Sequence, residues 1–394
     1  MSKLAIDGGE PVRMEPFPGW PMSDENELQA LKDVLMSGKW GVNNQNVQEF
    51  EDKYAEFMGV EHSIAVTSGT MALTITLIAA GIGRGDEVII PPYTFTATAG
   101  CVFAVNATPV FADIDSDTFN LDPKEMEKVI TDKTKAVMPV HIAGGPADMD
   151  GIMEVAKKHN LVVIEDACQA HAAEWCGKKV GGIGDIGCFS FQASKNLCAG
   201  EGGIITTNNK ELADECWSYH NCGRVKDGAR YEQRGLGANF RMTAWQAAIL
   251  LAQMERLVEQ TETRNRNGLY LSEKLSEIEG IEPTRRDEKV TTHAYHLYMF
   301  KYHADKFGGA PRARFLEALS AEGIPCSRGY HPLYKNDAFG PDGVVDYSDL
   351  HLPVVEKVCD EQAVWFKQSM LLGDQQDMDD IIKAIKKIKE NFTG

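Results

Sequence analysis

A single lysine, Lys195, stands among small residues where it could act as a nucleophile. It follows an apolar run at 187–191, which is typical of a buried strand, and it precedes the glycine-rich segment 200–203. A lysine removed from water loses part of its ammonium character, so its amine can attack a carbonyl carbon and form a Schiff base. The alternative is an ordinary solvent-exposed lysine in a loop, which is the commoner place for this residue type.

A carboxylate, Asp166, ends a second apolar run at 162–164. An apolar run of this kind predicts a buried strand that delivers the acid to its carboxyl end. Such a carboxylate could bind a metal ion, hold a ribose hydroxyl or pair with a cationic ring nitrogen. A plain helix-capping role is the alternative.

A short segment of small hydroxylic residues and a glycine connects a predicted strand to a helical pattern that begins at Met71. It consists of Thr67, Ser68, Gly69 and Thr70. Free backbone N–H groups at such a turn, together with the helix dipole, attract an anion such as a phosphate. Serine and threonine are also favoured as helix N-caps in any protein, so this segment alone does not establish a phosphate site. Together, the three segments supply a phosphate site, an acid and an amine, which are the parts that a pyridoxal 5′-phosphate (PLP) site requires.

These residues need a sheet whose strands end at one edge. Between about 60 and 210, short β-rich runs alternate with helix-period segments, which predicts a mainly parallel sheet covered by helices on both faces. Such sheets bind ligands at the carboxyl ends of their strands. Strands are predicted at 63–66, 87–90, 109–111, 136–140, 161–165, 187–191 and 203–207, and helices at 71–80, 123–130 and 149–158.

The pattern changes after about residue 210. A long helix is predicted from 243 to about 274, with a light break near Gln260, and strands follow at 295–301 and 324–326. A final amphipathic helix is predicted at 378–392. The expected fold class is therefore α/β, with a large mainly parallel-sheet domain at 1–255 and a small C-terminal α/β domain at 256–394. The N-terminal arm could pack with the small domain.

The composition is that of a soluble globular protein and disfavours several classes of partner. Of the 394 residues 43% are hydrophobic, and 58 acidic against 40 basic side chains give a formal net charge of −18. This charge disfavours nucleic acid and anionic membranes, and no apolar stretch is typical of a membrane helix or a secretory signal. The nine cysteines include no C-x-x-C pair, so we expect reduced thiols, no metal site and a cytoplasmic location.

Four segments resemble one enzyme family. They are SGTMAL at 68–73, EDACQAHAA at 165–173, SFQASKNLCAGEGG at 190–203 and GANFRMT at 237–243. These segments are similar to the sugar aminotransferases of the DegT/DnrJ/EryC1/StrS family. The resemblance covers nearly the whole chain, and the block around Lys195 is its most diagnostic part. It implies PLP fold type I, the aspartate aminotransferase-like fold, and PLP as the cofactor.

The resemblance also implies roles for single residues around the cofactor ring. Lys195 would bind PLP as a Schiff base and carry protons during the reaction. Asp166 would pair with the ring nitrogen, so that the cofactor remains an electron sink. Gln169 would lie near the ring hydroxyl. Phe95 would stack on the ring, with a core position on a helix as its alternative.

Further residues would hold the cofactor phosphate. Within one subunit the resemblance implies Gly69, Thr70, Ser190 and, through its backbone, Met71. Asn239 would reach the phosphate of the neighbouring subunit. This last contact implies a homodimer with shared sites as the smallest complete enzyme.

Two further stretches, 220–224 and 363–373, resemble glutamine:scyllo-inosose aminotransferases and 3-amino-5-hydroxybenzoate synthases within this family. This branch implies glutamine or glutamate as the donor and a keto-cyclitol or ketosugar as the acceptor of a ping-pong transamination. A nucleotide-ketosugar acceptor is the alternative, because fold and cofactor do not fix the substrate. The loop 328–334 would border the acceptor site or form plain surface. His141 and His171, beside predicted strand ends, could line the site, but a hydrogen-bonded structural role is expected for each.

Three rival functions differ in class. A PLP-dependent sugar dehydratase of the same fold resembles this family with His in place of the Schiff-base lysine, so Lys195 argues against it. A non-catalytic PLP-binding regulator is disfavoured by the joint presence of the lysine, the acid and the phosphate segment. A nicotinamide-dependent dehydrogenase is disfavoured because the glycines at 81, 83 and 85 precede a predicted strand instead of following one.

Overall fold

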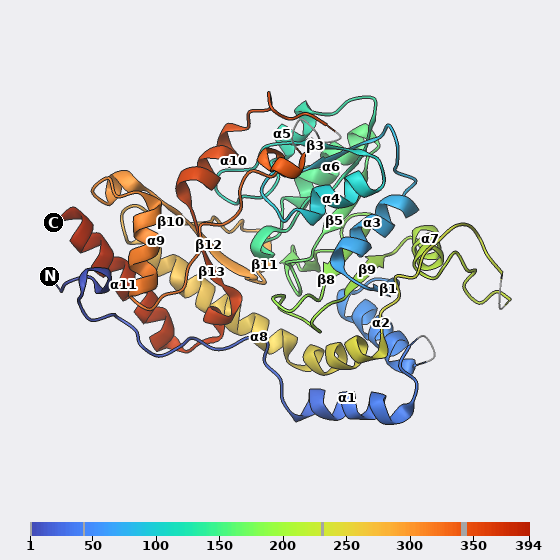
Figure 1. Cartoon of the computed structure of the whole chain (residues 1–394). Helices are drawn as coiled ribbons and strands as arrows, with labels where there is room; N and C mark the ends of the chain where they lie inside the picture. Colours follow the sequence, from blue (N-terminus) through green and yellow to red (C-terminus); the bar gives the residue numbers. More distant parts are fainter. Residues whose placement is uncertain (1, 42–43, 230–231, 340–344) are drawn as a thin grey trace.

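The computed structural model describes residues 2–41, 44–229, 232–339 and 345–394. A seven-stranded sheet with the order β1-β9-β8-β5-β4-β2-β3 forms the centre of the larger part (Figure 1). In this sheet β9 runs antiparallel to β1 and β8, whereas the other neighbouring pairs are parallel. The strands are β1 (His62–Val66), β2 (Glu87–Ile90), β3 (Thr108–Phe111), β4 (Thr134–Val137), β5 (Val162–Asp166), β8 (Ile186–Ser190) and β9 (Gly203–Thr207).

Helices cover both faces of this sheet. Because successive side chains of a strand point to opposite faces, Val88 and Ile90 pack in one core and Ile89 packs in another. The first core includes side chains of α3 (Gly69–Ala79), α4 (Ala97–Ala104) and α7 (Lys210–His220). The second core includes side chains of α2 (Gln45–Met58), α5 (Pro123–Lys128), α6 (Met149–His159) and α8 (Ala244–Ser276).

A smaller part of the chain is built on a three-stranded sheet of β10 (Ile281–Pro283), β12 (Leu297–Tyr302) and β13 (Ala363–Lys367). Its core combines this sheet with α9 (Arg312–Ala321), α11 (Gln375–Thr393) and the end of α8. Leu4 of the N-terminal arm belongs to the same core, and the two ends of the chain lie side by side here (Figure 1).

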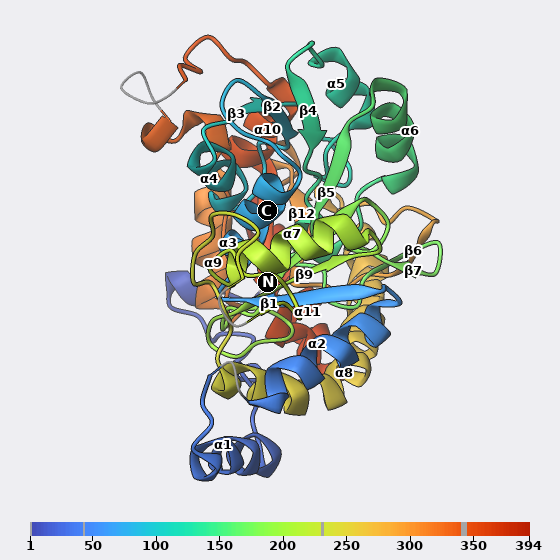
Figure 2. The same cartoon turned by 90° about the vertical axis from the view of Figure 1, so that its right-hand side faces the viewer.

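The remaining elements connect or flank these two parts. A second three-stranded sheet joins β6 (Glu174–Trp175), β7 (Lys178–Lys179) and β11 (Val290–Thr292), and α10 (Pro353–Lys357) precedes β13. Helix α1 (Glu25–Ser37) lies along α8, away from the seven-stranded sheet and from the sheet of β10, β12 and β13 (Figures 1 and 2). None of the helices in the described ranges is long and apolar enough to cross a membrane.

The strands predicted for the large sheet are confirmed, with ends that differ by a few residues, and so are the predicted helices. The strand predicted at 324–326 is wrong: Ile324 is buried in the core, but Pro325 has no N–H for a ladder, and the segment is irregular. The predicted break near Gln260 is also wrong. There the hydroxyl of Thr261 donates to Leu257 O at 2.8 Å, so a polar residue is accommodated while α8 continues unbroken. The predicted domain boundary near residue 255 falls inside α8 and stays a prediction.

The buried carboxylate of Glu322 links the N-terminal arm to the smaller part of the chain through hydrogen bonds. Glu322 is 0% exposed and accepts hydrogen bonds from Ala5 N at 2.9 Å, Val12 N at 3.0 Å and Lys387 Nζ at 2.8 Å. Lys387 is itself buried. Because removal of one partner leaves the other charge buried and unpaired, we expect Glu322→Ala to lower the free energy of unfolding by about 3–5 kcal/mol.

Urea unfolding followed by circular dichroism measures this effect. The matched control is Glu317→Ala on α9, since the side chain of Glu317 is 64% exposed and should change stability little. Equal unfolding midpoints for Glu322→Ala and the parent protein would contradict the role given to Glu322.

Candidate active site

A cavity of about 430 Å³ opens where the carboxyl ends of β5 and β8 meet the N-termini of α3 and α4. This is the edge of the sheet where a mainly parallel fold gathers ligands. Most of the residues predicted for the site line this cavity: Gly69, Thr70, Phe95, Asp166, Gln169, Ser190 and Lys195. Met71 and Asn239 lie outside its lining.

Asp166 is a buried carboxylate at the last position of β5. The apolar residues before it pack inside the sheet, so the strand brings the acid to the cavity. Its oxygens accept hydrogen bonds from Thr98 Oγ1 at 2.9 Å and from Cys168 N at 3.2 Å. In the described part of the chain it forms no ion pair. A buried anion without a counter-ion suits a ligand that brings its own positive charge, such as a protonated ring nitrogen.

Lys195 lies in the turn between β8 and β9, and its side chain lines the same cavity. Burial lowers the pKa of Lys195 below its ordinary value, against the opposing effects of Cys168 and Asp166. Its amine forms no ion pair with any residue that the structure describes. A larger share of the amine is therefore neutral than for a surface lysine, and a neutral amine is the nucleophilic form.

The N-terminus of α3 supplies backbone donors for an anion. The first N–H groups of a helix have no partner inside the helix. Among them, Met71 N donates to the N-capping side chain of Ser68 at 3.2 Å, which leaves those of Gly69 and Thr70 beside the cavity. A Cβ atom at Gly69 would lie 2.7 Å from Ser190 Cβ, so this approach of the helix to β8 needs a glycine.

The two side chains predicted to lie at the cofactor ring have different surroundings. Gln169 is held by the protein, because its Oε1 accepts from Ala143 N at 2.8 Å and its Nε2 donates to Tyr330 Oη at 3.3 Å. Burial raises the pKa of Tyr330 to about 12, so this phenol stays protonated. Phe95 precedes α4 and is 57% exposed, which places it at the cavity and not in the core. The lysine, acid, helix N-terminus and exposed aromatic ring together fit PLP.

Asn239 lies on the segment that connects α7 and α8. This segment projects from the body of the protein (Figure 1), and its Leu236 is 96% exposed. Asn239 is exposed as well and forms an isolated bridge with Asn221. It therefore does not reach the cavity of its own chain, and its predicted contact with a second subunit stays a prediction.

Three residues that the sequence motifs did not indicate also line the cavity. Thr98 lies in the first turn of α4, four residues after Thr94, and its hydroxyl contacts Asp166. His296 precedes β12, and burial lowers its pKa well below the usual value, so its imidazole is neutral. Tyr330 belongs to the loop 328–334, which thus contributes to the cavity wall. The hydroxyl spacing in the segment after β2 is the signal that could have indicated Thr98.

Two histidines near strand ends are structural, as the sequence led us to expect. His141 and His171 are each 0% exposed and lie outside the cavity lining. The ring of His141 bonds Glu165 Oε2 and Ala147 N, both at 3.0 Å. That of His171 bonds Ser190 O at 2.8 Å.

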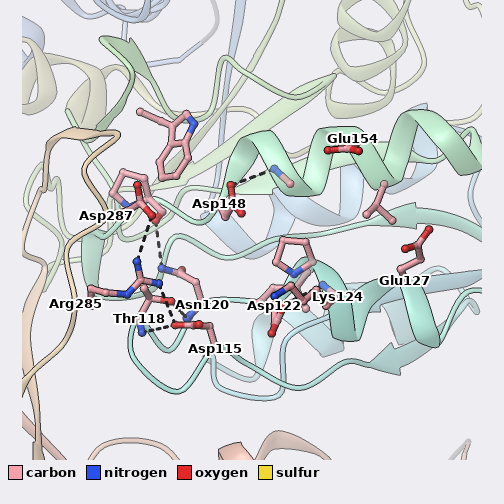
Figure 3. Close-up of a pocket in the computed structure, with 16 residues that line it drawn as sticks. Asp115, Thr118, Asn120, Asp122, Lys124, Glu127, Asp148, Glu154, Arg285 and Asp287 are labelled. Carbon is pink, nitrogen blue, oxygen red and sulfur yellow. Dashed lines mark hydrogen bonds and ion pairs between the residues drawn. The ribbon is translucent and has the colours of Figure 1, made fainter.

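A second cavity, of about 410 Å³, lies at the N-termini of α5 and α6 (Figure 3). Several of its acids serve as helix caps or ion-pair partners: Asp122 accepts from Lys124 N and Asp148 from Gly151 N, and Arg285 pairs with Asp287 at 3.3 Å. It contains none of the residues predicted for the site. The carboxylates around it are Asp115, Asp122, Glu127, Asp148, Glu154 and Asp287.

Comparison with known proteins agrees with this geometry. The chain matches the DegT/DnrJ/EryC1/StrS aminotransferase family over residues 21–386. The L-glutamine:2-deoxy-scyllo-inosose aminotransferase of Streptoalloteichus tenebrarius is 38% identical, over 98% of this chain and 97% of that protein. The crystal structure of 3-amino-5-hydroxybenzoic acid synthase has a TM-score of 0.89 at 32% identity, over 96% of this chain and 100% of that chain.

DesI, solved in the presence of its TDP-sugar product, has a TM-score of 0.85 at 28% identity, over 99% of this chain and 96% of that chain. The match to the family spans most of the sequence, and the relatives are similar over almost their full length. This chain therefore belongs to the DegT/DnrJ/EryC1/StrS aminotransferase family and is a PLP-dependent aminotransferase of that family's α/β fold.

Proposed function

We propose that this enzyme moves the amino group of glutamine to a keto-cyclitol. The family and the full-length similarity to relatives named for glutamine and a deoxy-scyllo-inosose support this donor and this acceptor. The observation that carries the proposal is the cavity itself. Among its described lining residues Lys195 is the one lysine or arginine, and Glu201 adds a carboxylate to the lining. Such a lining favours an uncharged polyhydroxy ketone over a diphosphate, which would need further cations.

The two central residues have separate roles in the proposed reaction. PLP, when bound, supplies an electrophilic carbonyl carbon and a conjugated ring that accepts electrons. Lys195 would hold the cofactor covalently and give it up to the amino group of the donor. Its free Nζ would then be the base for the proton of the donor α-carbon and, in the second half-reaction, the acid that returns a proton toward the aminated product. Asp166 would pair with the ring nitrogen.

The other predicted residues position the cofactor. In the proposal the N–H groups of Gly69 and Thr70 and the hydroxyl of Ser190 bind the phosphate. The backbone of Met71 contributes less to phosphate binding, because its N–H already donates to the side chain of Ser68. We also propose that Phe95 stacks on the ring and that Gln169 lies near the ring hydroxyl, where its bond to Tyr330 fixes its amide.

A cytoplasmic homodimer with shared sites is the proposed working form. The exposed Asn239 and Leu236, on a segment that projects from the body, support a contact with a second subunit. The cysteines are unpaired in the structure, which suits a reducing compartment. In this arrangement Asn239 of each subunit binds the phosphate in the site of the other.

Mixed dimers test whether the sites are shared. Asn239→Asp places a negative charge against the phosphate, and Lys195→Ala removes the amine, so each variant alone should have little activity. In a mixed dimer, one site combines an intact Lys195 with an intact Asn239. Random assembly from equal amounts should therefore restore about a quarter of the parent activity. If Asn239 acts within its own subunit, co-expression restores nothing beyond the activity of Asn239→Asp alone.

Half-reactions test the substrates. Enzyme loaded with pyridoxamine phosphate is offered scyllo-inosose, 2-deoxy-scyllo-inosose, a ketosugar phosphate and a nucleotide ketosugar, while the near-visible absorbance of the pyridoxal form is followed. We expect the uncharged cyclitol ketones to react fastest. In the reverse direction, glutamine should bleach the pyridoxal form faster than glutamate does. Rapid reaction with the nucleotide ketosugar alone would refute the keto-cyclitol proposal.

A nucleotide-ketosugar acceptor is the second candidate. Its support is the likeness to DesI, which was solved with a TDP-sugar product, and the loop 328–334, whose Arg328 is exposed next to the cavity residue Tyr330. The identity to DesI is lower than to the cyclitol relatives. The same panel of half-reactions decides between the two acceptors.

A further inference from the structure

A buried chain of two hydroxyl groups leads from the start of α4 to Asp166. Thr94 Oγ1 lies 3.0 Å from Thr98 Oγ1, which lies 2.9 Å from Asp166 Oδ2. The three residues are 2%, 1% and 5% exposed. An ionised carboxylate only accepts hydrogen bonds, so the hydroxyl of Thr98 donates to Asp166. Thr94 must then donate to the oxygen of Thr98.

Thr98 is the hydroxyl donor to this carboxylate among the described residues, and the thiol of Cys168 also lies beside it. The other bond, from Cys168 N, is longer at 3.2 Å and goes to the opposite oxygen, Oδ1. Two donors on different oxygens fix the plane of the carboxylate. Each oxygen keeps a lone pair for a further donor, such as a ring N–H that approaches from the cavity.

Because Asp166 is buried, the hydrogen bond from Thr98 contributes strongly to the stabilisation of its carboxylate. Removal from water disfavours the charged form of a carboxylate, and a hydrogen bond given to that form favours it. The nearby thiols of Cys101, Cys168 and Cys188 add no charge, because burial and the charge of Asp166 raise their pKa values and keep them neutral. In the described part of the chain, Asp166 forms no ion pair, although its charge acts on Lys195 in the same cavity and opposes the lowering of the Lys195 pKa by burial. The hydroxyl of Thr98 and the N–H of Cys168 are therefore the groups that hold this carboxylate directly.

We propose that Thr98, supported by Thr94, is a positioning residue that holds the carboxylate of Asp166 in place and aimed at the ring nitrogen of the cofactor. This inference rests on the proposed function, in which Asp166 pairs with that nitrogen. Thr98 acts through Asp166 and does not itself contact the reacting atoms. Its loss should lower kcat more than it raises KM, because a less strongly protonated ring accepts electrons less well in both half-reactions.

Three substitutions separate the hydroxyl from the shape of the side chain. Thr98→Val keeps the shape and removes the donor, Thr98→Ser keeps the donor, and Thr94→Val removes only the outer hydroxyl. A hydrogen bond to a charged group corresponds to a change of about tenfold or more, so we expect kcat to fall at least about tenfold in Thr98→Val. Thr98→Ser should stay within about threefold of the parent, and Thr94→Val should lie between them.

The decisive readout does not depend on turnover. The holoenzyme is prepared with PLP labelled with ¹⁵N in its ring, and the chemical shift of that nitrogen reports its protonation. The parent enzyme and Thr98→Ser should show the shift of a protonated ring, and Thr98→Val should move toward the neutral value. An unchanged shift in Thr98→Val, with kcat also unchanged, would overturn the inference.

Asp166→Asn, measured in the same way, keeps this inference separate from the proposed function. If Asp166→Asn moves the ring shift and Thr98→Val does not, the pairing holds and the role of Thr98 is wrong. If Asp166→Asn leaves the shift unchanged, the proposed pairing itself fails. Thermal unfolding of each holoenzyme identifies a variant that is misfolded. If Thr98→Val is misfolded, the comparison of Thr98→Ser with Thr94→Val decides. Equal ring shifts and equal kcat values in these two variants would then overturn the inference.

Discussion

Lys195→Ala should abolish turnover, with a loss of at least about 10⁴-fold in kcat/KM. The amine of Lys195 is the covalent attachment point of the cofactor in our proposal and also the group that moves the proton. The cavity offers no other lysine within its described lining, so no second amine replaces it. The variant should also lack the near-visible absorbance of the covalently bound cofactor, which a spectrum of the purified protein measures directly.

Two controls make this result specific. Lys195→Arg keeps a positive charge in the cavity but cannot form the covalent bond, so it should be as inactive as Lys195→Ala. Lys210→Ala changes a lysine whose side chain is 72% exposed on α7, and it should keep both colour and activity. A yellow and active Lys195→Ala enzyme would show that the assignment of Lys195 is wrong.

Asp166→Ala should reduce kcat by about 10²- to 10³-fold, the range measured when one preorganised electrostatic contact is removed from a transition state. The buried carboxylate favours a protonated ring nitrogen, and without it the ring withdraws electrons less strongly from the reacting carbon. The affinity for PLP should fall as well, because the cationic ring loses its counter-ion. Stopped-flow half-reactions and a titration of the apoenzyme with PLP measure the two effects.

Asp185→Asn is the matched control for Asp166. Asp185 accepts a hydrogen bond from Val163 N on the same strand β5 at 2.8 Å and lies outside the cavity lining. An asparagine can keep this bond, so activity and PLP affinity should be close to those of the parent. A kcat for Asp166→Ala within a few-fold of the parent would remove Asp166 from the mechanism.

The large sheet could be predicted from the sequence because its strands are buried on both faces. Each reads as a short apolar run, such as the one that ends at Asp166, and helices separate most of them. The strands β6 and β7 have two residues each and are too short to show any period. The error at 324–326 has a related cause, since burial of Ile324 in a core produces the same apolar signal as a strand.

The candidate site likewise contains residues that could be predicted from the sequence and residues that could not. Residues in contiguous motifs, such as Lys195, Asp166 and Gly69, could be predicted to meet at one edge of the sheet, and they do line one cavity. His296 directly precedes β12, and Tyr330 belongs to a loop after α9 that packs against the core of the large sheet, so both lie far along the chain from the motifs. No local spacing carries that information, so these contacts required the structure.

The central claim is that Lys195 carries the cofactor, and one chemical measurement tests it most directly. Reduction of the holoenzyme with borohydride converts a cofactor held on a lysine into a stable secondary amine. Digestion and tandem mass spectrometry then locate the pyridoxyl group. We predict that it lies on the peptide containing Lys195 and on that residue alone, and a pyridoxyl group on a different lysine, or on none, would contradict the account.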